Sequence, residues 1–171
     1  MAPAIAAHHG LDADRIVSGQ GSDDLLARVA RAYLGPGDTL IRTANGYLKV
    51  PNYAYACGAD VVSVPDDGFV PSVDRMIAAL TDRTRIVYLA NPENPAGTWL
   101  TDAGVRRLHA ALPDDVLLVL DCAYEEYVES PDHAPPHRLV EDAQNVVMAR
   151  TFSKIYGLAG ARVGWLYGPP P

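Results

Sequence analysis

Residues 116–120 form the most apolar run of the sequence, Val-Leu-Leu-Val-Leu, and Asp121 follows directly. A strand that is hydrophobic at every position must be buried on both faces, which is typical of the centre of a parallel sheet covered by helices. Other apolar or alternating runs recur along the chain, separated by segments with the spacing of amphipathic helices. This alternation predicts an α/β fold with a mostly parallel, doubly wound sheet and helices on both faces.

The bounds of the expected elements follow from these periodicities and from the Gly and Pro residues between them. We expect strands at residues 15–18, 39–41, 60–64, 85–90, 116–120, 146–148 and 162–167. We expect helices at residues 23–33, 72–80 and 101–112, and one of about a dozen residues that ends at Gly58. Residues 1–14 would be a lead-in, 15–168 one domain, 129–138 a Pro-rich surface loop within it, and 169–171 a tail.

Composition is that of an ordinary globular protein and argues against several classes of partner. The 171 residues are 49% hydrophobic and 20% charged, and 14 Lys+Arg against 21 Asp+Glu give a net charge of −7. Because the chain has no basic run, neither nucleic acid nor an anionic membrane is an expected partner. No signal-peptide pattern or long apolar stretch is present, so a cytoplasmic location is expected. The cysteines and histidines lack metal-ligand spacing, so no metal site is expected.

Polar residues follow several of the expected strands, at positions where parallel sheets bind ligands. These segments are residues 19–23, 91–97, 121–124 and 151–154. Because the carboxyl ends of parallel strands lie at one edge of a sheet, the segments should converge on one crevice. Lys154, in the last segment, is either a solvated surface charge or a partly desolvated amine with a lowered pKa that could attack a carbonyl.

Three of these segments allow a structural interpretation beside the functional one. The turn GQGSDD approaches the dinucleotide-binding fingerprint but lacks its third glycine. Its amides could bind an anion at the start of a helix, or Ser22 or Asp23 could simply cap that helix. Asn94 could donate its amide to a phenolate oxygen or form an Asx-type turn. Asp121 could cap its strand or place a charge in a ligand crevice.

The segment TFSKIYGLAGARVGWLYG resembles the lysine segment of the pyridoxal-phosphate (PLP) aminotransferases of fold type I, class I/II. Within that family it is most similar to the histidinol-phosphate aminotransferase branch. The resemblance implies that Lys154 forms the Schiff base with the cofactor aldehyde, and that Ser153 and Arg162 hold its phosphate. A similar Gly-Ser-Asp turn in this branch implies that Ser22 and Asp23 also bind the phosphate, mainly through their backbone amides.

The aromatic residue that stacks on the cofactor ring in this family corresponds to Tyr47. Flat rings suit stacking because their faces and edges carry opposite partial charge. Asn45 stands where the family has a proline two residues before that aromatic. Tyr53 and Tyr55, which follow on the expected helix, are interpreted as ordinary packing residues.

Two further strings resemble family motifs that contact the cofactor ring. NPENPAG resembles Asn-Pro-x-Asn-Pro-Thr-Gly, with Ala96 in place of threonine, and implies that Asn94 donates to the ring oxygen. DCAY resembles Asp-Glu-Ala-Tyr, with Cys122 in place of glutamate. It implies that Asp121 pairs with the protonated pyridine nitrogen and that Tyr124 contacts the ring oxygen.

By this resemblance the chain would be a PLP-dependent aminotransferase, with Lys154, Asp121 and Tyr124 as its catalytic residues. Its substrates would be an amino acid or amino phosphate and a 2-oxo acid, and the family implies a homodimer and a role in histidine biosynthesis. Because the match covers only the central cofactor domain, we expect the N-terminal arm and the small C-terminal domain to be absent. A PLP-dependent amino-acid-phosphate decarboxylase and a truncated, catalytically silent PLP-binding domain remain alternatives.

Overall fold

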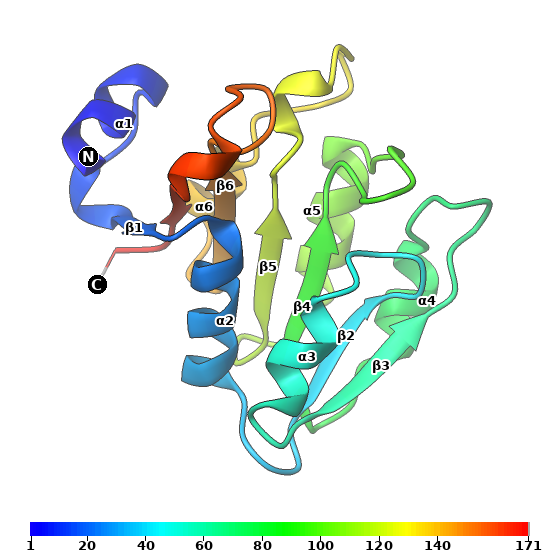
Figure 1. The fold of residues 1–171 in the computed structure, drawn as a ribbon. Coiled ribbons are helices and arrows are strands. Elements are labelled where there is room, and N and C mark those ends of the chain that lie inside the picture. The colour runs from blue at the N-terminus through cyan, green and yellow to red at the C-terminus, as the bar shows by residue number, and fades with distance from the viewer. Residues whose placement is uncertain (171) are drawn as a thin grey trace.

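A seven-stranded sheet forms the centre of the computed structural model, which describes residues 1–170 (Figure 1). Its strands are β1 (Ile16–Gly19), β2 (Thr39–Thr43), β3 (Asp60–Val64), β4 (Thr84–Ala90), β5 (Leu117–Asp121), β6 (Val146–Thr151) and β7 (Gly164–Tyr167). Their order across the sheet is β1-β7-β6-β5-β4-β2-β3. The strands from β6 to β3 pair in parallel, whereas β7 is antiparallel to both β1 and β6. The prediction of a mostly parallel sheet is confirmed.

Helices cover both faces of this sheet, as predicted (Figure 1). They are α1 (Ala2–His9), α2 (Ser22–Tyr33), α3 (Val50–Tyr55), α4 (Val73–Ala78), α5 (Asp102–Ala110) and α6 (His137–Asp142). One hydrophobic core joins α2 and α3 to the sheet, and a second core on the other face joins α1, α4, α5 and α6 to it. Within the described residues, no helix combines the length and hydropathy needed to cross a membrane.

Strand β5 connects the two cores, because its side chains alternate between them. Leu118 and Leu120 belong to the core beneath α5, and Leu117 and Val119 belong to the core beneath α2. Every residue of β5 is buried, including Asp121 at its end. The apolar run at residues 116–120 is therefore a central parallel strand, and the carboxylate that follows it stays at the buried carboxyl edge.

The helices differ from expectation in three places. Helix α1 lies within residues 1–14, and α6 begins at His137, inside the segment expected to be a loop. Both begin next to a proline, which suits the start of a helix because the first turn needs no amide donor. Helix α3 is shorter than expected, since residues 56–58 form turns that end at Gly58 with a positive φ. Of the expected tail 169–171, Pro171 lies outside the described residues.

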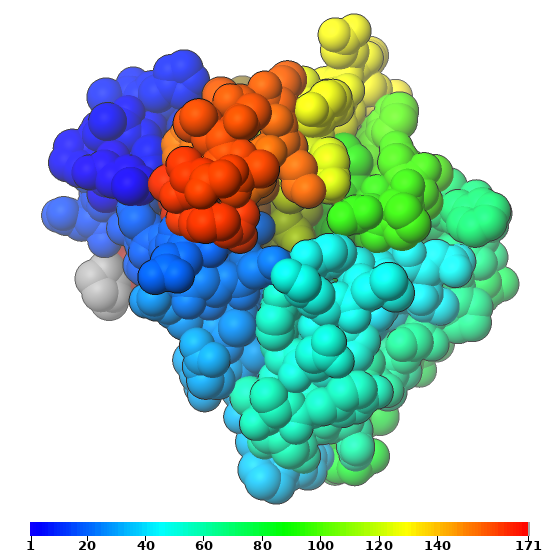
Figure 2. Space-filling view, in the orientation of Figure 1, coloured from blue at the N-terminus to red at the C-terminus, as the bar shows by residue number. Residues whose placement is uncertain are grey.

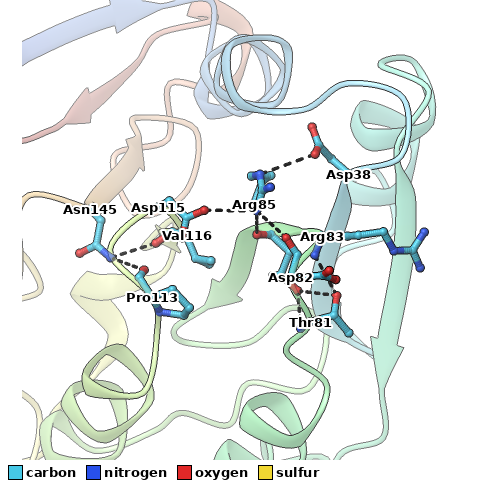
Figure 3. Close-up of polar contacts among 10 residues, drawn as sticks. Asp38, Thr81, Asp82, Arg83, Arg85, Pro113, Asp115, Val116 and Asn145 are labelled. Atoms are coloured by element: carbon cyan, nitrogen blue, oxygen red, sulfur yellow. Dashed lines mark hydrogen bonds and ion pairs between the residues drawn. The ribbon is translucent and has the colours of Figure 1, made fainter.

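The amino edge of the sheet is closed by polar contacts between loops (Figure 3). The Arg85 guanidinium donates to the carbonyl of Thr84 at 2.8 Å and pairs with the Asp38 and Asp115 carboxylates at 3.6 and 3.3 Å. The Asn145 amide donates to the carbonyl of Val116 at 2.9 Å. These contacts occupy the amino edge, and the polar segments singled out in the sequence lie at the opposite edge.

Candidate functional site

A pocket opens at the carboxyl edge of the sheet, where β1, β4, β5 and β6 end. In Figure 2 the surface is hollowed between the orange and red segment that follows β6, the blue start of α2 and the cyan turn before α3. The residues that the sequence analysis singled out all line this pocket: Ser22, Asp23, Tyr47, Asn94, Asp121, Tyr124, Ser153, Lys154 and Arg162. The predicted convergence on one crevice is thus found in the structure. Ala90, Pro92, Ala123, Thr151 and Ala159 complete the lining.

The start of α2 forms one end of the pocket. The residue before the helix is Gly21, with φ 79°, and no side chain of the described residues caps the helix. The interpretation of Ser22 or Asp23 as a cap is therefore wrong; it is the Asp24 carboxylate that accepts a turn amide, that of Gln20 at 3.1 Å. The first amides of α2 are left without side-chain partners among residues 1–170, and such a helix start attracts anions.

Arg162 brings a positive charge to this helix start. Its Nη1 donates to Ser153 Oγ at 3.4 Å and to the carbonyl of Ala159 at 3.0 Å. A Cβ added to Gly21 would lie 2.6 Å from Arg162 Nη2, so the guanidinium rests directly against the turn, which needs glycine there. Within the described residues Arg162 has no carboxylate within 4.0 Å. A guanidinium, a serine hydroxyl and helix amides together suit a phosphate group.

Asp121 forms the acidic part of the pocket. Its side chain is buried at the end of β5, where Oδ2 accepts the Tyr88 hydroxyl at 2.7 Å and Oδ1 accepts the Ala123 amide at 3.3 Å. Burial raises the pKa of Asp121, and the hydrogen bond from Tyr88 and the charge of Lys154 oppose that rise only in part. A buried carboxylate is costly unless it meets a positive or strongly donating group, so this acid suits a cationic ligand atom.

Lys154 lines the same pocket as Asp121, as the predicted convergence of their two segments requires. Its Nζ lies 5.0 Å from the centroid of the Tyr124 ring, within range of a cation–π contact. The residue itself is exposed, so of the two interpretations of Lys154 left open by the sequence, the structure shows the solvated one. The reason is the loop that carries Lys154: residues 154–162 run along the surface with exposed side chains.

The Asp23 carboxylate collects hydrogen bonds from the segment that follows β2. Lys49 Nζ lies 2.7 Å and the Tyr47 hydroxyl 3.3 Å from its Oδ2, while the Tyr53 hydroxyl donates to Oδ1 at 2.9 Å. Burial by itself would raise the pKa of Asp23, but the bonds from Lys49 and Tyr53 outweigh it and hold the pKa below its ordinary value. Tyr53 packs against the hydrophobic core, as interpreted from the sequence, and its hydroxyl also holds Asp23 in place. Tyr55, by contrast, is 61% exposed and packs little.

The turn before Tyr47 is held by Asn45, which occupies the position of the family's proline. Its backbone amide and its side-chain amide both donate to Asp66 Oδ2, at 3.2 and 2.8 Å. A proline would fix this turn through its restricted φ, and here the two hydrogen bonds hold it instead. The departure from the family motif thus leaves Tyr47 facing the pocket.

The loop that carries Asn94 is fixed by buried polar contacts. Asn91 exchanges two hydrogen bonds with the backbone of Leu100, at 3.1 and 2.8 Å. The buried Glu93 carboxylate accepts hydrogen bonds from the Thr43 hydroxyl at 2.7 Å and from the backbone N–H of Asn94 at 3.0 Å. Within residues 1–170 the Asn94 side chain makes no such local bond, so the Asx-turn interpretation does not hold. The side-chain amide of Asn94 is therefore free to bind a ligand in the pocket.

Some residues that hold the pocket lining in place were not predicted from the sequence, among them Tyr88 and Glu93. Tyr88 lies inside an expected strand, where a tyrosine looks like any other core aromatic. Glu93 is the variable position of the Asn-Pro loop motif, so the motif gave no reason to select it. Their partners come from other strands, and only strand order and register reveal those contacts.

The comparison with protein families agrees with this geometry. The family model described as aminotransferase class I and II matches residues 1–171. The chain belongs to this family. The resemblance of its lysine segment to that of the aminotransferases is thereby confirmed.

Several relatives of this aminotransferase chain are histidinol-phosphate aminotransferases. That of Ruegeria pomeroyi is 54% identical over 166 residues, which are 97% of this chain and 45% of the relative. That of Granulibacter bethesdensis is 49% identical over 167 residues, which are 98% of this chain and 45% of the relative. The crystal structure of histidinol-phosphate aminotransferase from Sinorhizobium meliloti in complex with pyridoxal-5′-phosphate is 37% identical, with a TM-score of 0.93 over 99% of this chain and 46% of that one. The chain thus spans a little under half the length of these relatives.

Proposed function

We propose that this aminotransferase chain binds PLP and forms the cofactor-binding part of an enzyme that transfers amino groups. The observation that carries the proposal is the meeting of three groups in one pocket: Asp121 at the end of β5, and Lys154 and Arg162 from the loop that follows β6. An amine, a buried acid and a guanidinium without a carboxylate partner in the described chain complement the aldehyde, ring nitrogen and phosphate of PLP.

The phosphate would bind at the start of α2. Arg162 would form charge-assisted hydrogen bonds with it, and Ser153 Oγ, 3.4 Å from Arg162 Nη1, would add a hydroxyl donor. The backbone amides of Ser22 and Asp23 would donate to it along the direction of the helix dipole. The Asp23 side chain is engaged by its own donors, so its negative charge is partly balanced before a phosphate arrives.

The remaining lining would hold the aromatic ring. Tyr47 would stack on it, and its hydroxyl bond to Asp23 limits the rotation of that side chain. Asn94 and Tyr124 would donate to the ring oxygen, since neither side chain has a hydrogen-bond partner among the described residues. Asp121 would hold the proton on the ring nitrogen, because a buried carboxylate is stabilised by a positive partner.

Bound PLP would supply an electron sink for the pair left on the substrate carbon when a proton departs. Lys154 Nζ would hold the cofactor through its aldehyde carbon. When it is free, the same amine would accept and return the proton of the substrate carbon as general base and acid. The Tyr124 ring, 5.0 Å from Nζ, would steady the lysine while it is charged.

The substrates would be histidinol phosphate or a related amino acid as amino donor and a 2-oxo acid as acceptor. The support is the set of relatives about half identical in sequence, whose names state this activity. A PLP-dependent decarboxylase is not favoured, because the matching relatives and the family model are aminotransferases. Decarboxylation would release carbon dioxide and leave an amine, whereas transamination would convert the donor to the corresponding oxo compound, so product analysis separates the two.

We further propose that the protein acts as a homodimer. Leu48 and Phe69 are 82% and 63% exposed and line an open groove beside Tyr47 and Asn94. Large exposed hydrophobic side chains next to a site are typical of a surface that another chain covers. Sedimentation of the wild type and of a Leu48→Glu variant tests this: the variant should dissociate at a higher protein concentration.

Borohydride trapping tests PLP binding sharply, because Lys49 and Lys154 are the only lysines in the sequence. PLP should give a visible absorbance band, and reduction followed by peptide mass spectrometry should find the adduct on Lys154. Lys49→Arg should keep the adduct and Lys154→Ala should lose it. An adduct on Lys49 alone, or none, would contradict the proposal. An adduct that no amino donor converts to the pyridoxamine form would support a catalytically silent domain instead.

A further inference from the structure

Tyr88 lies directly behind the pocket and does not line it. It is 2% exposed and belongs to the hydrophobic core between the sheet and helices α2 and α3. Its hydroxyl donates to Asp121 Oδ2 at 2.7 Å, and both atoms are buried. A core position of this kind needs only an aromatic ring, and a phenol hydroxyl is costly there unless it is bonded. The Tyr88 hydroxyl is therefore explained by its hydrogen bond to the Asp121 carboxylate and not by core packing.

The register of the sheet creates this contact. Ala90 pairs with Asp121 and Tyr88 pairs with Val119, so all four side chains lie on the face that carries α2 and α3. Ala90 is small and leaves room beside Asp121, which the ring of Tyr88 reaches from two residues earlier on β4. Within residues 1–170, the other Asp121 oxygen, Oδ1, accepts only the weaker bond from the backbone amide of Ala123, at 3.3 Å.

We propose that Tyr88 is a positioning residue that keeps Asp121 ionised and fixed in orientation, so that a proton shared with a ligand ring nitrogen stays on the nitrogen. This inference rests on the proposed PLP site. A hydrogen bond to a carboxylate favours its charged form, and a second fixed donor in a buried site leaves it little freedom to rotate.

The direction of the hydrogen bond follows from the surroundings. Burial raises the pKa of Tyr88 well above its ordinary value, and the Asp121 charge adds to this, so the phenol keeps its proton and acts as the donor. Other titratable groups also act on the pair and must stay unchanged in any test. They are Asp23 on α2, Arg42 on β2, Tyr47 before α3, Tyr53 on α3, Glu93 after β4, Cys122 after β5 and Lys154 after β6.

A pH-dependent double-mutant cycle tests the coupling without any ligand. Unfolding free energies would be measured from mildly acidic to mildly alkaline pH for the wild type, Tyr88→Phe, Asp121→Asn and the double variant. Tyr167→Phe is the matched control, because Tyr167 is equally buried but lies on the other face of the sheet.

The raised pKa of Asp121 determines how the stability of each variant should change with pH. Below its ordinary value of 3.8 the acid is protonated in the folded and unfolded states alike, and ionisation in the folded protein costs stability as pH rises through the raised pKa. Tyr88→Phe removes a bond to the ionised form, so its loss of stability should grow with rising pH. In the Asp121→Asn background and in Tyr167→Phe this growth should be absent. An equal loss at every pH would overturn the proposal.

A PLP titration then shows whether the coupling serves the ligand. Tyr88→Phe should weaken PLP binding by about tenfold, the effect of losing one hydrogen bond to a charged group, and should weaken it no further once Asp121 is Asn. If the wild type binds no PLP, the proposed function fails, and the pH cycle still decides the coupling of Tyr88 to Asp121. If the wild type and Tyr88→Phe bind PLP equally, the inference fails and the proposed function stands.

Discussion

The Tyr53 hydroxyl donates to Asp23 Oδ1 at 2.9 Å, and this bond joins α3 to the first turn of α2. Tyr47 and Lys49 contact the other oxygen of the same carboxylate. Tyr47 and Asp23 both line the pocket. The Asp23 carboxylate therefore sets the position of the Tyr47 ring relative to the first backbone amides of α2. The segment after β2 is thereby tied to a helix that precedes it in the chain.

Asp23→Asn should lower the free energy of unfolding by about 1 kcal/mol at neutral pH, because an amide replaces the charged acceptor of these bonds. The pKa of Asp23 lies below 3.8 in the folded protein, so this stabilisation is present above pH 3.8 and is lost as pH falls through the lowered pKa. Denaturant unfolding at several pH values measures the effect. Asp82→Asn, on an exposed turn, removes the same charge and should change stability little. An Asp23→Asn effect of equal size in strong acid would contradict the assignment.

Arg162→Ala should weaken PLP binding by about 10- to 100-fold, the effect of losing charge-assisted bonds to a phosphate. Pyridoxal, which lacks the phosphate, should bind the wild type and the variant almost equally. Absorbance titration with both ligands separates the contribution of the phosphate to binding from that of the ring. Arg28→Ala is the control, since Arg28 pairs with Asp24 on the surface of α2 and does not line the pocket. Equal weakening of both ligands would place Arg162 elsewhere than at the phosphate.

The fold and the pocket lining could be predicted from sequence because both depend on local pattern. The apolar run before Asp121 and the polar residues after it are adjacent in the chain, and parallel sheets place ligands at the strand ends. The same holds for Lys154, which follows β6 within a long motif. Periodicity located the strand ends, and the resemblance of the motifs to those of the aminotransferases selected Lys154 and the other lining residues.

The contacts behind the lining could not be predicted in this way. The bond from Tyr88 to Asp121 depends on which strand lies beside β5 and in what register. The bond from Thr43 to Glu93 joins residues from segments whose neighbourhood is set by the order of strands across the sheet. Helix α6 was missed because two prolines precede it, a pattern shared by loops and by helix starts.

Glu93→Gln should gain stability relative to the wild type as pH rises. Burial raises the pKa of Glu93 above its ordinary 4.5, and bonds from Thr43 and Asn94 only partly oppose this. The folded wild type must therefore ionise a buried acid as pH rises from 4.5 through the raised pKa, which costs stability, whereas glutamine has no such cost. Denaturant unfolding across this range measures the difference. Glu141→Gln on α6, where the residue is exposed, should show no comparable trend.

Gly164→Ala should destabilise the protein and disturb the phosphate end of the pocket, because β7 packs against the start of α2 with no room for a side chain. A Cβ at Gly164 would lie 2.5 Å from both Gly21 C and Ser22 N, and 2.9 Å from the carbonyl oxygen of Arg150. These are backbone atoms, which cannot rotate away, so we expect a loss of about 1–3 kcal/mol in denaturant unfolding. Gly160→Ala is the matched control, since a Cβ there meets no atom within 4 Å. Equal stability of the two variants would show that the start of α2 does not rest on β7 as described.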